Sequence, residues 1–366
     1  MAVPESSPGR PEAASSARFF VDGHVDLPYL MVNRAPKSML SEIDDAPFTL
    51  RRARDAGIKL FFSALYCEDR FNGDPAFAHF QELLDVTRKH YDQVDILKDI
   101  STLREAPEGS DKVGTLFLLE NADALADHLS FIDHLQENGV FVVGLTHIGA
   151  NRLADGNGVR YSEGLTRRGK AVIHHLSEKG LLVDVAHLHP QCFWELMRRS
   201  EAPVVSSHTG IRDIFDTPRN LTLEQVEEMA QRGGVVGITF NPEMLGPSHT
   251  ASLQDVFAHL DTVVQRLGPD PVGIGSDFCG FDSITEGLED VRGIAHLWDI
   301  LQAHGYPRHA MARIMGDNWM RVLRAPSIHP HDGGMKSGGG AQSALTGPGP
   351  TVHGQPPKPA SNRALD

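Results

Sequence analysis

The sequence predicts an α/β protein whose parallel strands close into an eight-stranded (β/α)8 barrel, the TIM-barrel architecture. Three observations predict this fold. Short apolar runs alternate with amphipathic segments along most of the chain. The runs are almost continuously apolar, which is typical of strands buried on both faces. No G-x-G-x-x-G motif or P-loop follows any of them, which disfavours an open nucleotide-binding sheet.

Eight runs rich in apolar and β-branched residues are predicted as strands: Phe19–Asp26, Lys59–Cys67, Val113–Asn121, Val140–His147, Leu181–His187, Pro203–His208, Gly234–Phe240 and Val272–Phe278. The amphipathic segments between them are predicted as helices: Thr49–Ala56, Ala124–Glu137, Leu165–Lys179, Gln191–Arg199, Leu223–Gln231 and Leu253–Leu267. Several of these helices stop at a glycine just before the next strand, where glycine favours a left-handed cap.

The ends of the chain differ in composition from its centre. Residues 1–18 are rich in Pro, Ser, Ala and Glu, and residues 327–366 are rich in Gly, Pro and Ser. Such segments bury too little apolar surface to fold, so a disordered arm and a disordered tail are predicted. The barrel domain is therefore expected at 19–326, which exceeds the roughly 250 residues that a (β/α)8 barrel commonly needs.

Composition disfavours several classes of partner. With 34 Lys and Arg against 48 Asp and Glu, the formal net charge is −14, which disfavours nucleic acid and anionic membranes as partners. No apolar run reaches the roughly 18–20 residues that span a bilayer, and the first residues lack the apolar core of a signal peptide. The three cysteines, Cys67, Cys192 and Cys279, are far apart, which disfavours disulfides and a thiolate zinc site.

Ionisable residues stand where many of the predicted strands end. The carboxyl ends of barrel strands meet at one face, and that face carries the active site in such barrels. The residues at those ends are His24, Asp26, Glu120, His147, His187, His208 and Asp277. A barrel built for packing alone would not end so many strands in this way.

Five of these residues are predicted to form a site for two zinc ions. His24 and Asp26 alternate along a strand and so point to the same side. Together with His187 and His208 they are expected to be terminal ligands, and Glu120 is expected to bridge the two ions. Imidazole and carboxylate donors suit zinc, and a zinc pair supplies a bridging hydroxide as nucleophile near neutral pH.

Three further residues are predicted to act on the substrate. Asp277 is expected to take a proton from the bridging water and pass it to the leaving amine, the alternative being a turn-capping aspartate. His147 is a sixth ligand, a core histidine or a donor to the developing oxyanion, and we favour the donor. Arg219 is expected to clamp a substrate carboxylate, the alternative being a surface arginine paired with Asp213 or Asp216.

The motifs around these residues resemble those of the membrane (renal) dipeptidases and their bacterial relatives. The resemblance runs from about Phe19 to Leu323 and opens with Asp22-Gly23-His24-Val25-Asp26-Leu27-Pro28. The motifs that follow in the family's order are Leu119-Glu120, Leu145-Thr146-His147, Asp184-Val185-Ala186-His187, Val205-Ser206-Ser207-His208, Pro218-Arg219-Asn220, Gly275-Ser276-Asp277-Phe278, Gly287-Leu288-Glu289-Asp290 and Asp317-Asn318-Trp319-Met320-Arg321-Val322.

This resemblance implies a zinc-dependent dipeptidase on an amidohydrolase-type barrel, acting on small dipeptides. It implies that His24, Asp26, Glu120, His187 and His208 bind zinc. Likewise it implies that His147 and Arg219 contact the substrate and that Asp277 is the catalytic acid and base. Members of the family are often dimeric, so a homodimer is expected. The chain lacks the signal peptide and lipid-anchor tail of mammalian members, so a soluble, cytoplasmic enzyme is expected.

Two rival functions stay open at this point. One is a dinuclear hydrolase of another amide or ester, such as a cyclic amide, a lactone or a secondary-metabolite conjugate, although the first two would not need Arg219. The other is a metal-binding homologue without turnover, which would not need Asp277. The sequence also departs from the family at Cys279, with the next aspartate at Asp282, so the shape of the pocket rim and the side-chain preference stay open.

Overall fold

The computed structural model of the protein describes residues 19–34, 37–100, 113–199, 204–248 and 250–325. These residues fall in one unit of the chain, Met1–Pro330. The predicted arm at 1–18, the predicted tail at 327–366 and Pro203, the first residue of a predicted strand, lie outside the described residues. The limits of the barrel domain therefore stay predictions.

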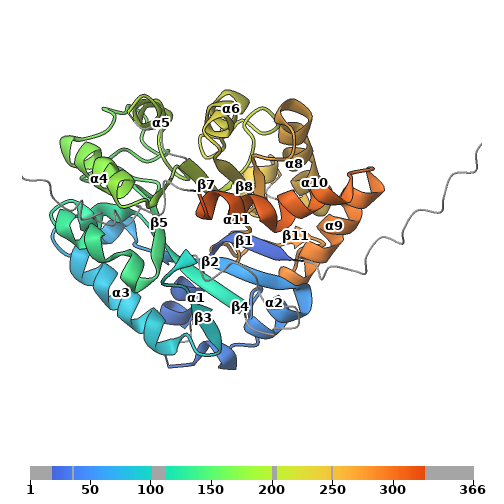
Figure 1. Cartoon of the computed structure of the whole chain (residues 1–366), viewed down its shortest axis with the longest axis horizontal. Helices are drawn as coiled ribbons and strands as arrows, with labels where there is room; N and C mark the ends of the chain where they lie inside the picture. Colours follow the sequence, from blue (N-terminus) through green and yellow to red (C-terminus); the bar gives the residue numbers. More distant parts are fainter. Residues whose placement is uncertain (1–18, 35–36, 101–112, 200–203, 249, 326–366) are drawn as a thin grey trace, which may run out of the picture. The chain divides into compact units, whose positions relative to one another are not determined.

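Eight parallel strands form a closed ring (Figure 1). They are β1 (Phe20–Val25), β2 (Ile58–Tyr66), β4 (Val113–Glu120), β5 (Val140–Gly144), β6 (Leu182–Asp184), β7 (Val204–Thr209), β8 (Val235–Ile238) and β10 (Val272–Ile274). The ring closes where β10 pairs with β1, with Asp22 opposite Ile274. The predicted (β/α)8 barrel is confirmed.

Helices surround the ring of strands (Figure 1). They are α1 (Leu27–Arg34), α2 (Leu50–Ala56), α3 (Ala76–His90), α4 (Arg167–Glu178), α5 (Pro190–Met197), α6 (Leu223–Gln231), α7 (Pro242–Leu245), α8 (Leu253–Leu267), α9 (Ile294–Ala303), α10 (Arg308–Ala312) and α11 (Asn318–Leu323). Particular residues begin and end these helices, as α2 illustrates. The Thr49 hydroxyl accepts a hydrogen bond from the backbone N–H of Arg52 at the start of α2, and Gly57 ends the helix with a left-handed φ of 84°.

Two features differ from the sequence-based expectation. The predicted helix at 124–137 is a chain of 3₁₀ turns, Ala122–Leu125, Leu129–His134 and Gln136–Asn138, because His128 between them has non-helical backbone angles (φ −125°, ψ 47°). The structure also has three short strands that were not predicted: β3 (Val94–Ile96) extends the sheet beside β4, and β9 (Ala251–Ser252) pairs with β11 (Thr285–Glu286).

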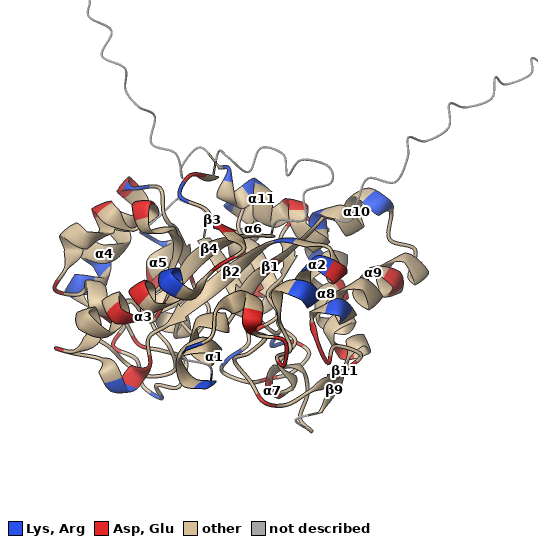
Figure 2. Cartoon of the chain, turned by 90° about the horizontal axis from the view of Figure 1, so that it is seen from below, with Lys and Arg blue, Asp and Glu red and all other residues tan. Residues whose placement is uncertain are grey.

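Trp319, from α11, fills the end of the barrel opposite the carboxyl ends of the strands. Figure 2 shows α11 at one end of the barrel and α1 and α7, which follow strand ends, at the other. The Trp319 ring is fully buried, packs edge-on against Phe62 at 5.0 Å between centroids, and its indole N–H donates to the Ile274 carbonyl at 2.9 Å. A Cβ at Gly23 or Gly273 would lie only 2.4 or 2.5 Å from this ring, so the ring fits only against glycine.

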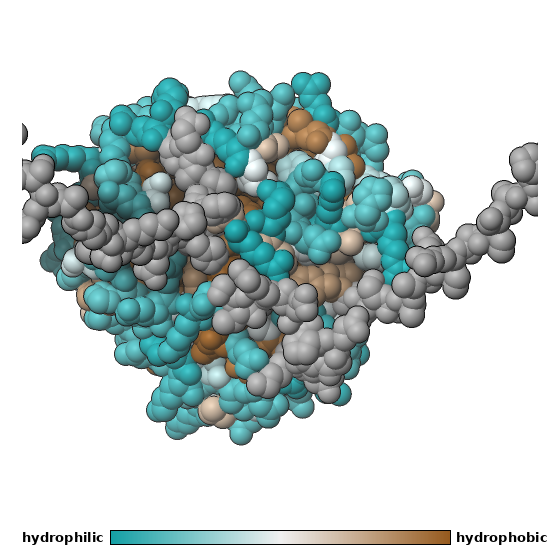
Figure 3. Space-filling model, in the orientation of Figure 1, coloured by the Kyte–Doolittle hydropathy of each residue, from teal (hydrophilic) through white to brown (hydrophobic). Residues whose placement is uncertain are grey.

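The face drawn in Figure 3 is mostly polar outside the grey atoms. Figure 3 shows a largely hydrophilic face with apolar colour confined to small areas. Few large apolar side chains are exposed among the described residues; these are Val32, Ile148, Tyr161, Ile214 and Ile284. No helix in the described part of the chain has both the length and the apolar character needed to cross a bilayer.

Three strands end three or more residues earlier than predicted. β5, β6 and β10 stop at Gly144, Asp184 and Ile274, so His147, His187 and Asp277 lie in the loops that follow. His187 and Asp277 are left-handed (φ 63° and 67°), a conformation that cannot continue a strand, so neither strand can extend through its site residue. Non-glycine residues held in this region are strained, and such strain is concentrated at functional sites.

Candidate active site

A cavity of about 480 Å³ opens at the carboxyl ends of the strands. Seven of the eight predicted site residues line it: Asp26, Glu120, His147, His187, His208, Arg219 and Asp277. The eighth, His24, is completely buried beside Asp26 and Glu120. The structure therefore brings together all the residues that the sequence analysis singled out, although they come from the ends of six strands and from the loops that follow those strands.

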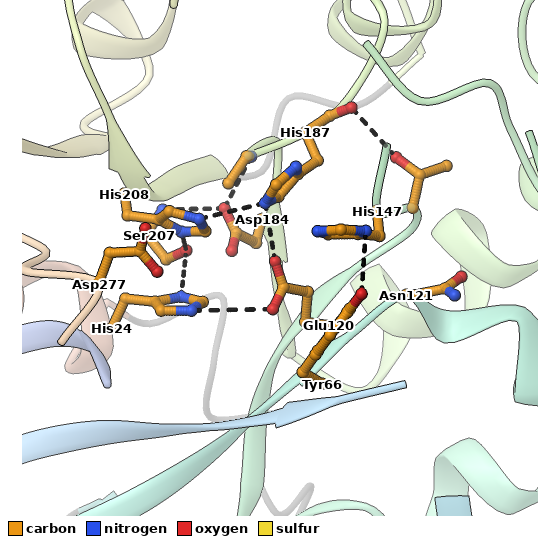
Figure 4. A network of polar contacts seen from close by, with 12 residues as sticks. His24, Tyr66, Glu120, Asn121, His147, Asp184, His187, Ser207, His208 and Asp277 are labelled. Atoms are coloured by element: carbon orange, nitrogen blue, oxygen red, sulfur yellow. Dashed lines mark hydrogen bonds and ion pairs between the residues drawn. The ribbon is translucent and has the colours of Figure 1, made fainter. Parts of the chain in front are cut away.

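The carboxylate of Glu120 lies between two groups of donor atoms (Figure 4). Its Oε1 is 2.9 Å from Nε2 of His187, and its Oε2 is 3.8 Å from Nε2 of His24. His24 Nε2 is in turn 3.3 Å from Oδ2 of Asp26, and His187 Nε2 is 3.2 Å from Nε2 of His208. One oxygen of Glu120 thus faces His187, and the other faces His24.

These separations match the spacing of ligands around a zinc ion. Two donors at 2.0–2.1 Å from one zinc and at the tetrahedral angle lie about 3.3 Å apart. Two of the buried atoms that could ligate a metal, His24 Nε2 and Asp26 Oδ1, have no hydrogen-bond partner. Buried polar atoms are usually paired, so an unpaired imidazole nitrogen and an unpaired carboxylate oxygen on two adjacent side chains fit a bound cation.

Metal-ligating atoms of further side chains also lie close together in the site. Among the described residues, three groups could each hold an ion, with ligand atoms within 4.8 Å of one another: His24, Glu120 and His208; Glu120, His147 and His187; and His24, Asp26 and Asp277. The site therefore offers more donors than two ions need.

Burial and close charges set the protonation of these groups. Burial lowers the pKa of His187 and of His208 well below its usual value, which favours the neutral imidazole that binds metals. For His24, burial acts in the same direction, but the adjacent Asp26 and Glu120 carboxylates outweigh it and raise the pKa to about 10. A group of carboxylates strong enough to do this also attracts a divalent cation.

Asp277 faces the cavity from the loop after β10. Its Oδ2 accepts a hydrogen bond from the Asn241 side-chain amide at 3.1 Å. Burial, followed by the nearby negative charge of Asp26, raises the pKa of Asp277 well above its usual value. A carboxyl group with its pKa raised in this way is a candidate for proton transfer.

His147 stands at the side of the cavity and is half-buried, which excludes the core-histidine alternative. Its Nδ1 lies 3.3 Å from the Tyr66 hydroxyl and 3.6 Å from Oδ2 of Asp69. Because these two groups flank Nδ1, the other ring nitrogen is left for the site. His147 also belongs to one of the three donor groups, so the ligand and the electrophile roles both fit its position.

Arg219 reaches into the cavity, which excludes the surface alternative. Its expected partners in that alternative are engaged elsewhere, because Asp216 pairs with Arg212 at 2.6 Å and Asp213 accepts from the backbone N–H of Leu223. The Arg219 Nη2 donates to the His208 carbonyl at 3.2 Å and contacts Nε2 of the same residue. Burial lowers the pKa of Arg219, as expected for a guanidinium held away from water.

Some residues of the site were missed at the sequence level. Tyr66 and Asn241 line the cavity, and Asp22, Asp184 and Ser207 lie beneath it with at most 2% exposure. Asp22 and Asp184 are buried acids that each accept a backbone N–H from the residue two positions later. Each also accepts a second backbone N–H, Asp22 from Ser276 just after β10 and Asp184 from Ser207 on β7. Adjacency to a predicted ligand, as in Asp22-x-His24, is the signal that could have found them.

The rim after β10 takes a shape that the sequence left open. Asp282 points away from the cavity and pairs on the surface with Arg34 at 2.7 Å. Cys279 has a left-handed backbone (φ 73°), and burial raises the pKa of its thiol to about 12, so it is an unreactive thiol. Gly280 is packed against the carboxylates, because a Cβ there would lie 2.3 Å from Asp26 Oδ2 and 2.5 Å from Asp277 Oδ1.

Comparison with known sequences identifies similar proteins along most of the chain. A profile of the membrane dipeptidase family, peptidase family M19, matches residues 12–329. Dipeptidase verJ of Clonostachys rogersoniana is 26% identical over 323 residues, covering 83% of each chain. Dipeptidase 3 of Mus musculus is 25% identical over 329 residues, covering 86% of this chain and 66% of that protein. An uncharacterised Klebsiella pneumoniae protein from the pqqA 5' region is 31% identical over 165 residues, covering 44% and 60%. The chain thus spans less than two thirds of the last two proteins.

Comparison with solved structures supports the same fold. A structure described as dipeptidase AC, a metallopeptidase of family M19, gives a TM-score of 0.75 at 24% identity and covers 84% of this chain and 98% of that one. A metallopeptidase of Rhodobacter sphaeroides, solved with a phosphinate mimic of the dipeptide L-Ala-D-Ala, gives a TM-score of 0.74 at 24% identity, covering 84% and 99%.

Proposed function

The chain belongs to the membrane dipeptidase family, peptidase family M19, and on this basis we propose that it is a zinc-dependent dipeptidase that hydrolyses dipeptides to free amino acids. One observation carries the proposal beyond family membership. A group of histidines and carboxylates with the spacing of zinc ligands lines the same cavity as a carboxyl group with a raised pKa and a guanidinium. These are the parts that hydrolysis of a small charged amide requires.

We assign His24 and Asp26 to one zinc ion, His187 and His208 to the other, and Glu120 to both. The positions of the Glu120 oxygens, one towards each histidine group, support this assignment. Zinc ions bound there would polarise the scissile carbonyl and supply a shared hydroxide as nucleophile near neutral pH.

Asp277 then moves the protons of the reaction. Its Oδ2 is held by Asn241, and the carboxyl group lies beside Asp26, so it can accept a proton from the attacking water and donate it to the leaving amine. His147, with Nδ1 directed to Tyr66 and Asp69, supports the developing oxyanion through its other nitrogen.

Arg219 selects for a free carboxylate. His208 Nε2 cannot accept a hydrogen bond from Arg219 and bind a cation at the same time, so we expect the guanidinium to turn towards the substrate when the site is loaded. A guanidinium binds a carboxylate through two parallel hydrogen bonds, which suits the end of a dipeptide. The substrates of a cyclic-amide or lactone hydrolase have no free carboxylate for this guanidinium to bind.

Purified protein loaded with zinc tests this proposal on L-Ala-L-Ala, L-Ala-D-Ala, a C-terminally amidated dipeptide, a cyclic dipeptide and a lactone. Both free dipeptides are on the panel because the Rhodobacter sphaeroides relative was solved with an L-Ala-D-Ala mimic. We expect hydrolysis of at least one free dipeptide, loss of activity with a chelator, and recovery with zinc. Preference for the lactone or the cyclic dipeptide would support the rival hydrolase, and zinc binding without any turnover would support the non-catalytic homologue.

The expected homodimer and cytoplasmic location remain predictions, to be tested by light scattering and cell fractionation.

A further inference from the structure

The Ser207 hydroxyl lies between two of the proposed zinc ligands. Its Oγ is 3.0 Å from Nδ1 of His24 and 2.9 Å from Nδ1 of His208 (Figure 4). All three side chains are buried, with at most 2% exposure. His24 comes from β1 and His208 from β7, so one hydroxyl joins two strands that are not neighbours in the sheet.

In both histidines Ser207 contacts Nδ1, the ring nitrogen that faces away from the other proposed zinc ligands. Nε2 of His24 faces Asp26 and Glu120, and Nε2 of His208 faces His187. An imidazole that binds a cation through Nε2 carries its single proton on Nδ1. Two such Nδ1–H groups need two acceptors, and a hydroxyl oxygen has two lone pairs. Ser207 therefore satisfies both histidines when both bind through Nε2.

Asp184, on the neighbouring strand β6, fixes the position of Ser207. Its Oδ1 accepts the backbone N–H of Ser207 and that of Ala186, each at 2.9 Å. With both lone pairs of Ser207 taken by histidines, its hydroxyl hydrogen needs an acceptor, and the Asp184 carboxylate is the adjacent one. The group is then fully hydrogen-bonded, which a buried polar network requires if it is to be rigid.

We propose that Ser207 is a positioning residue that holds His24 and His208 as Nε2 ligands of the two zinc ions, and that Asp184 holds Ser207. The proposal rests on the proposed two-zinc function. Because the two histidines are assigned to different ions, loss of one hydroxyl weakens binding at both sites together. Residues that orient a zinc-binding histidine typically contribute 10- to 100-fold in metal affinity.

The neighbouring residue Ser206 provides a matched control. It lies on the same strand, is equally buried, and its Oγ has no hydrogen-bond partner. Ser207→Ala and Ser206→Ala thus remove the same group from adjacent positions. Only the first change removes contacts to histidines.

The test is a zinc titration of the metal-free protein against a coloured chelator, which measures affinity without using turnover. We expect both zinc affinities to fall by about 10- to 100-fold in Ser207→Ala and to stay unchanged in Ser206→Ala. Circular dichroism and a thermal melt establish that each variant is folded.

Asp184→Asn serves as the second variant if Ser207→Ala is unfolded. It keeps an oxygen for the two backbone N–H groups and removes the acceptor for the hydroxyl, so weaker binding of both ions is again expected.

The outcomes separate the two proposals. If the wild type binds fewer than two zinc ions, the two-zinc function is wrong. If the wild type binds two ions and folded Ser207→Ala and Asp184→Asn bind them as tightly as Ser206→Ala does, the positioning role is wrong and the proposed function stands. A loss confined to one ion contradicts the link between the two sites.

Discussion

The Asn241 side-chain amide donates a hydrogen bond to one oxygen of Asp277 and accepts another through its own oxygen. Its Nδ2 donates to Asp277 Oδ2 at 3.1 Å, while its Oδ1 accepts the backbone N–H of Glu243 at 3.1 Å, at the start of α7. The Glu243 contact fixes which end of the amide is oxygen, so the amide hydrogens must point to Asp277. The Asp277 carboxylate is thus oriented by a helix start on the neighbouring strand's loop.

Asp277→Asn separates proton transfer from metal binding. The new amide can keep an oxygen towards Asn241, and its NH2 group then faces the site and cannot accept a proton. We expect the variant to retain both zinc ions while kcat falls by about 10²–10⁴-fold, the usual contribution of a general acid–base group. Elemental analysis and steady-state kinetics measure the two quantities. Turnover near that of the wild type would return Asp277 to the alternative of a turn residue.

Glu120→Ala should remove the shared ligand and with it most of both zinc ions. Its two oxygens face His187 and His24, so no other carboxylate among the described residues that line the cavity is placed to replace both contacts. We expect about two zinc ions per chain in the wild type, far fewer in Glu120→Ala, and no measurable activity. Glu243→Ala is the control, because Glu243 lies on the exposed rim of the same cavity and should leave the zinc content unchanged. A Glu120→Ala protein that keeps both ions would show that Glu120 is not a ligand.

The sequence was sufficient for the barrel and for the residues at its strand ends, because both follow from local patterns. Alternating apolar and amphipathic segments specify strands and helices, and the parallel arrangement then places His24, Glu120 and His208 at one face. The helix predicted at 124–137 failed because its apolar spacing gives no sign of the non-helical backbone at His128.

The contacts made by the residues that support the site could not be predicted, because these contacts join strands that are distant in the sequence. Ser207 meets His24 across 183 positions of sequence, and Asn241 meets Asp277 across 36. Neither pairing has a spacing rule. The sequence carries residue types and the order of strands, whereas the register that brings a particular hydroxyl to a particular nitrogen comes from packing across the whole barrel.

Gly280→Ala should damage the site without unfolding the barrel. The new methyl group would lie 2.3 Å from Asp26 Oδ2 and 2.5 Å from Asp277 Oδ1, so at least one carboxylate must move. A displacement of about 1 Å at a catalytic group can cost on the order of 100-fold in rate. We expect a fall of that size in kcat/KM with only a small change in Tm. Gly246→Ala is the control, since nothing lies within 4 Å of a Cβ there and its φ of −174° suits any residue. Full activity in Gly280→Ala would mean that the loop after β10 moves freely.

The proposed substrate is a dipeptide with a free carboxylate. Two zinc ions would activate many amides, so selection for a short substrate must come from groups beside them. Among the described residues that line the cavity, Arg219 is the one that always carries a positive charge. If it binds the substrate carboxylate, amidation of the dipeptide removes a charge-assisted pair worth about 1.5–3 kcal/mol, or about 10- to 150-fold in kcat/KM.

Arg219→Ala should therefore lose a similar factor on the free acid and should no longer distinguish acid from amide. Arg219→Lys should recover only part of the loss, because a single ammonium cannot reproduce the two parallel hydrogen bonds of a guanidinium. Arg212→Ala is the matched control, since Arg212 lies in the same loop but pairs with Asp216 at 2.6 Å. The measurement is kcat/KM for acid and amide on all four proteins. Equal rates for acid and amide in the wild type would show that Arg219 does not bind the carboxylate, and the wider hydrolase alternative would then be favoured.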